Sequence, residues 1–185
     1  MRKAAFLDRD GVINEDTGYV HRWEDFKFIP GALAGMKRLQ DLGFLLVVVT
    51  NQSGLARGYY TEHQYQLLNA KLKQHLTEYG IILAGLYHCP HHIKGIVPKF
   101  AIECDCRKPA PGMILRASRE LGLFLPQSLM FGDKYSDGEA AQAAGVGDSY
   151  YINSDKSKFK KATKLFKGQF ESLEVCITHL FPKVQ

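Results

Sequence analysis

The sequence predicts an α/β protein in which a doubly wound, Rossmann-like parallel sheet has helices on both faces. Short segments such as Ala4–Leu7 and 44–49 are apolar along their whole length, which is typical of strands buried on both sides. Amphipathic segments separate them, and strands that alternate with helices form parallel sheets. At 185 residues, with 45% hydrophobic and 23% charged residues, the chain is expected to form one domain over residues 1–185.

Each helix and strand has a local signal. Residues 44–49 are rich in β-branched side chains, which favours a buried strand. Gly43 and Gly80 close the first two helices, Thr61 caps the second, and Pro111 lies in the first turn of the third. In chain order the expected elements are strand Ala4–Leu7, helix 31–42, strand 44–49, helix 62–79, strand 82–87, helix 111–121, strand Leu129–Gly132, helix 136–144 and strand 149–152.

Three polar residues directly follow predicted strands. These are Asp8, Thr50 and Asp133. The carboxyl ends of parallel strands meet at one edge of the sheet, and ligands bind at that edge in open α/β folds. We therefore expect the three residues to belong to one site.

The first of these residues opens the motif Asp8-Arg9-Asp10-Gly11. Two carboxylates two residues apart at a strand end can face one pocket while Arg9 points elsewhere. Their like charges repel unless a cation compensates them, and a hard cation with oxygen ligands does so. Gly11 permits the tight turn that follows. Because Asp-x-Asp is common, the interpretation depends on further motifs.

Three further motifs carry groups that can hold a phosphate or its metal. Each also has an ordinary structural explanation: a strand-to-helix turn, a solvated pair of charges, or an acid that favours a helix N-terminus. The motifs are Thr50-Asn51-Gln52-Ser53-Gly54 with its hydroxyl and backbone amides, Arg107-Lys108-Pro109 before a helix, and Gly132-Asp133-Lys134 followed by Asp137.

A separate group of metal-ligand types lies within residues 88–108. Cys89-x-His91 and Cys104-x-Cys106 together supply three sulfurs and one nitrogen, a complete tetrahedral set for zinc. His92 is an alternative nitrogen ligand, and buried thiols beside an unrelated histidine are the other explanation. Four protein ligands would make the zinc structural, and the metal would stiffen the loop that presents the third motif.

Together the four motifs resemble the haloacid dehalogenase (HAD) superfamily of phosphohydrolases. The resemblance implies a magnesium-dependent phosphatase in which Asp8 attacks phosphorus to form an acyl phosphate. Asp10 would protonate the leaving oxygen and then activate water. The resemblance also implies catalytic roles for Thr50, Arg107 and Lys108. The implied Mg²⁺ ligands are Asp8, Asp133 and the backbone carbonyl of Asp10, and Asp137 would support that metal site.

With the cysteine-rich loop included, the chain from Phe6 to about Val146 is similar to the D-glycero-D-manno-heptose-1,7-bisphosphate 7-phosphatase family. This narrower resemblance implies removal of the 7-phosphate to leave heptose 1-phosphate, a step toward nucleotide-activated heptose for lipopolysaccharide or surface-layer glycans. It also matches His91, not His92, to the zinc site. The matching segments are Asp8 to Asn14, Gly18-Tyr19-Val20, Val48 to Gly54, Ala56-Arg57-Gly58, Cys89-Pro90-His91-His92, Cys104 to Pro109 and Gly132-Asp133-Lys134.

Substrate choice must come from loops. Only one helix fits between Asp10 and Thr50, so the fold has no large cap domain. A sugar with two phosphates needs a second cationic contact away from the reacting phosphate, for which Arg57, Arg107 and Lys134 are candidates. The residues expected to bind the substrate are Asp16, Gly18, Tyr19, Asn51, Gln52, Ser53, Arg57 and Lys134.

Composition and charge weigh against other classes of protein. The net charge of +5 lies entirely within residues 155–167, which hold six lysines and Asp155; such a segment is expected to be solvated, without the aromatic array of single-strand binders. The longest apolar run cannot cross a bilayer, and no signal-peptide pattern precedes Ala4–Leu7. We therefore expect a cytoplasmic, monomeric enzyme that binds neither nucleic acid nor membrane.

Two alternatives from other classes remain at this point. A histidinol-phosphate phosphatase is similar in its zinc ligands, with a shorter loop between them, and would prefer that monophosphate as substrate. A zinc-stabilised nucleic-acid-binding module without catalysis would use the basic segment, and its binding would weaken steeply with salt.

Overall fold

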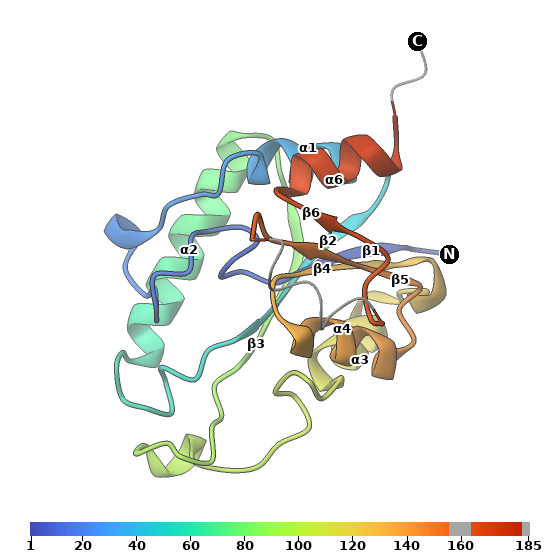
Figure 1. Ribbon diagram of the computed structural model, residues 1–185. Helices are drawn as coiled ribbons and strands as arrows, with labels where there is room; N and C mark the ends of the chain where they lie inside the picture. The colour runs from blue at the N-terminus through green and yellow to red at the C-terminus, as the bar shows by residue number, and fades with distance from the viewer. Residues whose placement is uncertain (156–163, 183–185) are drawn as a thin grey trace.

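The computed structural model describes residues 1–155 and 164–182 and contains a parallel sheet of six strands within them (Figure 1). The order across the sheet is β3-β2-β1-β4-β5-β6, and every neighbouring pair is parallel. The strands are β1 (Ala4–Leu7), β2 (Leu45–Asn51), β3 (Leu83–Cys89), β4 (Leu129–Gly132), β5 (Asp148–Ile152) and β6 (Gln169–Phe170).

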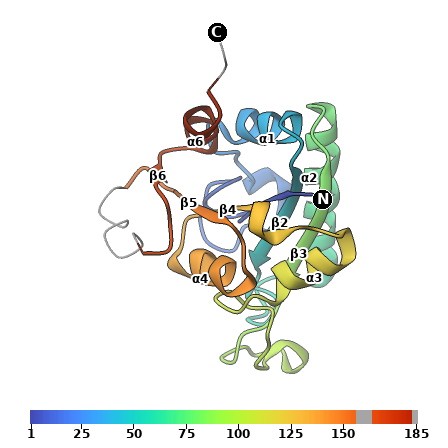
Figure 2. The same cartoon turned by 90° about the vertical axis from the view of Figure 1, so that its right-hand side faces the viewer.

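Five α-helices of the described residues cover the sheet. Figure 2 shows α1 and α6 on one side of it and α3 and α4 on the other. The helices are α1 (Ala32–Asp41), α2 (Glu62–Glu78), α3 (Gly112–Leu121), α4 (Tyr135–Ala144) and α6 (Leu173–Leu180); three short 3-10 helices lie at Trp23–Asp25, Pro98–Phe100 and Leu125–Gln127.

Alternating side chains of the central strands enter two separate cores. In β1, Ala5 and Leu7 pack with side chains of α1, α2 and α6, whereas Ala4 and Phe6 pack with those of α3 and α4. All four residues of β1 are fully buried, which explains why the strand is apolar throughout. The predicted doubly wound α/β fold is confirmed.

The sequence placed the main elements within two residues of their observed ends. Thr61 begins α2 with a reciprocal capping box to Gln64, as expected from its residue type. Strand β3 extends two residues beyond the expected 82–87, so Cys89 is its last residue. The two-residue strand β6 was not predicted, because a segment this short carries no measurable periodicity.

The loops at the carboxyl edge of the sheet lie close to one another. Gly11 follows β1 with φ of +95°, and a Cβ atom there would lie 2.2 Å from Oδ2 of Asp133. This position therefore requires glycine for its backbone angle and for the approach of the β4 loop. The segment between β3 and α3 projects from the sheet on the side of these loops (Figure 1, yellow-green).

None of the helices within residues 1–155 and 164–182 is long and apolar enough to span a membrane. Most of the lysine-rich segment 155–167 lies outside the described residues, so the structure does not bear on the expectation that it is solvated. Of its remaining lysines, Lys167 forms an ion pair with Asp148 at 3.3 Å.

Candidate active site

Asp8 follows β1 directly and is held at the carboxyl edge of the sheet by contacts with β4, Arg9 and Lys108. Its backbone N–H donates to the carbonyl oxygen of Phe131 in β4 at 3.0 Å. Its Oδ1 accepts from the N–H of Arg9 at 2.8 Å and lies 3.0 Å from Nζ of Lys108. Burial raises the pKa of Asp8 to about 6, although the ammonium of Lys108 opposes the shift.

Lys108 is a buried cation between two carboxylates. Its Nζ lies 2.6 Å from Oδ1 of Asp137 and donates to the carbonyl oxygen of Val49 at 2.8 Å, besides its contact with Asp8. Burial alone would lower the pKa of Lys108, but the carboxylates of Asp137 and Asp8 outweigh burial and raise the pKa. The side chain is therefore charged. A buried ammonium group needs anionic partners of this kind to keep its charge.

Three carboxylates gather where β1 and β4 end. One oxygen each of Asp8, Asp133 and Asp137 lies within 4.8 Å of the others. Burial and the charge of Asp8 raise the pKa of Asp133 to about 8, and Oδ1 of Asp133 is buried with no hydrogen-bond partner among the described residues. This set of oxygen donors suits a hard divalent cation.

The carboxylate of Asp10 contacts donors from three residues. Nη2 of Arg9 lies 2.8 and 3.0 Å from its two oxygens, and Nδ2 of Asn14 and Nε2 of Gln52 each donate at 2.9 Å. Arg9 is fully buried and donates to the carbonyl oxygen of Val20. The motif predicts that Arg9 points away from the two aspartates. Its guanidinium instead folds back onto Asp10, because a buried guanidinium requires a carboxylate partner.

The turn after β2 contacts the other site residues through side chains. Nε2 of Gln52 donates to Oγ1 of Thr50 at 2.8 Å, and the hydroxyl of Tyr60 donates to Oε1 of Gln52 at 2.5 Å. Asn51 forms two hydrogen bonds with the backbone of Lys108. Its Oδ1 accepts from the N–H of Lys108 at 3.1 Å, and its Nδ2 donates to the carbonyl oxygen of Lys108 at 3.0 Å. Ser53 lies in the same turn, where its carbonyl oxygen accepts from the N–H of Arg57.

The loop after Asn14 lies next to the residue after Asp133. Oδ2 of Asp16 lies 3.0 Å from Nζ of Lys134, and Lys134 lowers the pKa of Asp16 although partial burial opposes it. Gly18 and Tyr19 both have positive φ, and the ring centroids of Tyr19 and Tyr59 lie 4.6 Å apart. Tyr19 is largely exposed.

A cleft of about 610 Å³ lies beside Lys108. Most of the charged side chains that line it are cationic. Arg57 is 3.1 Å from Nε2 of His92, and Nη1 of Arg107 donates to the carbonyl oxygen of His91. The residues that line the cleft are Arg57, His92, Ile93, Lys94, Ile102, Glu103, Cys104, Arg107, Lys108 and Pro109.

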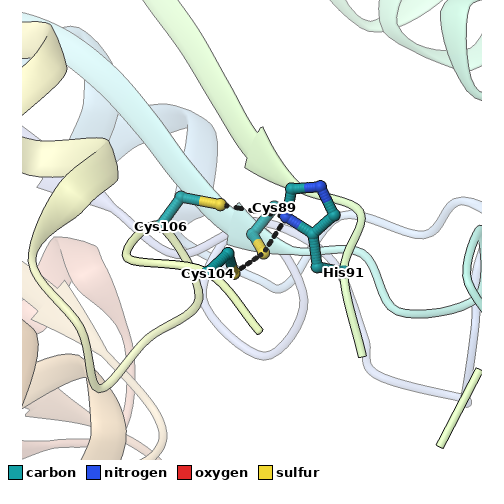
Figure 3. Close-up of side chains that lie close together, drawn as sticks. All are labelled: Cys89, His91, Cys104 and Cys106. Carbon is teal, nitrogen blue, oxygen red and sulfur yellow. Dashed lines mark hydrogen bonds between the residues drawn. The ribbon is translucent and has the colours of Figure 1, made fainter. Parts of the chain in front are cut away.

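The three cysteines and one histidine of the β3–α3 segment form a compact cluster (Figure 3). Sγ of Cys89 lies 3.6 Å from Sγ of Cys104 and 3.7 Å from Nδ1 of His91, and Sγ of Cys106 lies 3.4 Å from the same nitrogen. His92 is not in this group. Cys89 is the last residue of β3, so the cluster joins the loop to the sheet.

Sequence reasoning did not single out Asn14 or Tyr60, and it gave Arg9 no role. Arg9, Asn14 and Tyr60 are all buried. A buried arginine inside an acidic motif could have been suspected from the apolar residues that flank the motif on both sides. The role of Tyr60 could not, because seven residues and a turn separate it from Gln52.

The chain is similar in sequence to known phosphatases. A HAD-hydrolase-like family model matches residues 105–163. The D-glycero-beta-D-manno-heptose-1,7-bisphosphate 7-phosphatase of Escherichia coli K12 is 48% identical over 153 residues, which cover 83% of this chain and 80% of that protein. The D-glycero-alpha-D-manno-heptose-1,7-bisphosphate 7-phosphatase of Photorhabdus laumondii is 44% identical over 150 residues, 81% of this chain and 82% of that protein.

A solved structure is similar over the whole fold. The D,D-heptose 1,7-bisphosphate phosphatase of B. bronchiseptica, complexed with magnesium and phosphate, has a TM-score of 0.85 at 27% identity and covers 98% of this chain and 99% of its own.

Replacing Asn51 by Ala should lower the free energy of unfolding by about 1–3 kcal/mol, because the N–H and carbonyl oxygen of Lys108 lose their partner in a partly buried place. Gln40 is a matched control, since its amide bridges Gly80 and Ile82 in the same two-way manner at the surface. There water replaces the amide, so Gln40→Ala should cost at most about 1 kcal/mol. Urea denaturation of both variants measures the difference, and equal losses would contradict it.

Proposed function

Because the chain belongs to the D-glycero-D-manno-heptose-1,7-bisphosphate 7-phosphatase family of HAD-like hydrolases, we propose that it hydrolyses the 7-phosphate of this sugar bisphosphate. The products are heptose 1-phosphate and phosphate. The observation that carries the proposal is the buried contact of Asp8 with Lys108 beside Asp133 and Asp137. It supplies a nucleophile, a cation and acidic metal ligands at one strand edge.

In the first step, an oxygen of Asp8 forms a bond to phosphorus while the bond from phosphorus to the sugar oxygen breaks. Asp10 transfers its proton to the leaving oxygen. The ammonium of Lys108 and the hydroxyl of Thr50 stabilise the phosphoryl oxygens. Lys108 is suited to this role because its neighbours hold it charged and buried.

In the second step, water attacks the phosphorus of the acyl phosphate, and the bond to Asp8 breaks to release phosphate. The carboxylate of Asp10 takes the proton of that water. The structure describes Asp10 with Arg9, Asn14 and Gln52 as donors. These donors hold the oxygens of Asp10 in place for proton transfer.

The acidic cluster fits magnesium. The raised pKa of Asp133 and the buried oxygen of that residue without a partner among the described residues are what a site for a divalent cation would offer. We assign Asp8, Asp133 and the backbone carbonyl of Asp10 as ligands, with Asp137 as support through Lys108 and the backbone N–H of Lys134. Magnesium there would neutralise charge between Asp8 and the phosphoryl oxygens.

The cationic cleft supports recognition of the second phosphate. Arg57, Lys94 and Arg107 line it together with Lys108, so a phosphate on carbon 1 would meet cations while the 7-phosphate lies at Asp8. Lys134, which directly follows Asp133, pairs with Asp16, and the two side chains offer a donor and acceptors for sugar hydroxyls. The names of the relatives include both anomers, so the preferred anomer is a question for the substrate test.

The cysteine–histidine cluster fits structural zinc. The 3.4–3.7 Å spacings between its ligand atoms agree with those of a tetrahedral site with Zn–S bonds of about 2.3 Å. Burial raises the pKa of Cys89 and Cys106, so a bound cation would be needed to keep these thiols deprotonated. All four positions come from protein, which leaves no place for a substrate.

In this proposal residues 1–185 form one phosphatase domain. The enzyme is cytoplasmic and monomeric, it acts on a small sugar, and it contributes to nucleotide-activated heptose for lipopolysaccharide synthesis.

Phosphate release across a substrate panel tests the proposal. With Mg²⁺, kcat/KM for one anomer of heptose 1,7-bisphosphate should exceed that for histidinol phosphate and fructose 1,6-bisphosphate by at least about 100-fold, because a poorly placed substrate loses rate steeply. Greater turnover of histidinol phosphate would replace the proposal with that activity. Salt-sensitive binding of DNA without any phosphate release would support the non-catalytic alternative.

Asp8→Asn should remain folded and lose at least about three orders of magnitude in kcat, because an amide is a poor nucleophile and carries no charge for the metal. The matched control is Asp41→Asn, which removes a surface carboxylate paired with Lys37 and should leave kcat unchanged. Steady-state kinetics and circular dichroism of both variants provide the measurement. Retention of about a tenth of wild-type activity in Asp8→Asn would reject the role of Asp8.

Cys104→Ser and Cys106→Ser should each lower the zinc content from about one ion per chain and reduce activity by roughly 100-fold, since the loop that holds Arg107 and Lys108 loses its attachment to β3. Cys176→Ser is the control, because Cys176 lies in the core against α1 and the sheet and should leave zinc content unchanged. Elemental analysis of the purified proteins measures the metal. A fully active wild-type protein without zinc would refute this assignment.

A further inference from the structure

Gln52 connects two residues of the proposed reaction to a buried tyrosine. Its Nε2 donates to Oδ2 of Asp10 at 2.9 Å and to Oγ1 of Thr50 at 2.8 Å. Its Oε1 accepts from the hydroxyl of Tyr60 at 2.5 Å. Gln52 is 3% exposed and Tyr60 is 4% exposed, so water competes little with these bonds.

The hydrogen bonds around Asp10 indicate which end of the Gln52 amide faces it. Nη2 of Arg9 lies within 3.0 Å of both oxygens of Asp10, and Nδ2 of Asn14 donates to Oδ1 at 2.9 Å, so both oxygens accept hydrogen bonds. Nε2 of Gln52 is the amide atom that faces Oδ2. It is a donor, which suits an oxygen that already accepts from Arg9.

This orientation determines the hydrogen bonds at both ends of the network. Oε1 of Gln52 can only accept, so Tyr60 must donate, and burial raises the pKa of Tyr60 so that its hydroxyl keeps its hydrogen. At the other end, Oγ1 of Thr50 accepts from Gln52. The hydroxyl hydrogen of Thr50 is thereby left for another acceptor, such as an oxygen of a phosphoryl group.

We propose that Gln52 and Tyr60 are positioning residues: Tyr60 fixes the Gln52 amide, and the amide holds Asp10 in place and directs the hydroxyl hydrogen of Thr50 toward the phosphoryl group. The inference rests on the proposed function, which gives Asp10 and Thr50 their roles. Both N–H groups and the oxygen of the Gln52 amide are used inside the protein. Gln52 therefore acts through its two neighbours, in contrast to the substrate contact that its place in the sequence predicts.

Tyr60→Phe removes one hydroxyl and keeps the ring that stacks on His21. It should lower kcat about tenfold with KM for the bisphosphate unchanged within about twofold, because a buried hydrogen bond is lost away from the substrate. Gln52→Ala should lower kcat at least as much, again with little change in KM. Adding Tyr60→Phe to Gln52→Ala should have almost no further effect, since the hydroxyl then has no amide to orient.

Tyr65→Phe is the matched control. Tyr65 is as deeply buried as Tyr60, its ring lies 6.4 Å from that of Tyr60, and its hydroxyl is next to Asn69. It should retain wild-type kcat and KM even if its melting temperature falls as much as that of Tyr60→Phe.

Several results would overturn the inference. Wild-type kcat in Tyr60→Phe would do so, as would a kcat loss of equal size in Tyr65→Phe, which would indicate a general effect of buried hydroxyls. A Gln52→Ala variant with raised KM and unchanged kcat would make Gln52 a substrate contact. These outcomes differ from failure of the wild-type enzyme to release phosphate from the bisphosphate, which would reject the proposed function and the inference with it.

Discussion

The arrangement of the site depends on one buried ammonium group, that of Lys108. It contacts the carboxylates of Asp8 and Asp137 and the carbonyl oxygen of Val49. Without this cation, three carboxylates would share a buried space at the ends of β1 and β4, and their repulsion would favour protonated, non-nucleophilic forms. The lysine thus keeps Asp8 usable as a nucleophile, while Asp133 is left to a divalent metal.

Much of the surrounding structure positions this one side chain. Asn51 bonds to both backbone polar groups of Lys108 and so links its loop to the end of β2. Cys106 lies two residues before Lys108 and belongs to the cluster that joins the loop to Cys89 at the end of β3. The loop that carries the cation is therefore attached to two adjacent strands. A phosphatase with no large cap domain can in this way combine a rigid catalytic edge with recognition by loops.

The sequence was sufficient for the fold and for the edge at which the site lies, because buried parallel strands are apolar throughout and the residue after each strand is easily identified. It was not sufficient for the directions of polar side chains. The sequence did not indicate that the amides of Asn51 and Gln52 bond to Lys108, Asp10 and Thr50, and the substrate contacts expected of both residues stay a prediction. Such contacts depend on how separate loops meet, and the periodicity of a sequence does not indicate which loops will be in contact. The choice between His91 and His92 was likewise open from spacing alone, and the structure has Nδ1 of His91 beside the sulfurs.

The central claim is that phosphate passes through a covalent bond to Asp8. The most direct measurement is acid quenching of the enzyme within milliseconds of mixing with heptose 1,7-bisphosphate and Mg²⁺, followed by digestion and mass spectrometry. The account predicts a phosphorylated peptide containing residues 4–10, with the phosphate on Asp8, stable in acid and lost in base. A phosphate on another residue, or turnover with no phosphoenzyme at any quench time in either the wild type or Asp10→Asn, would contradict it.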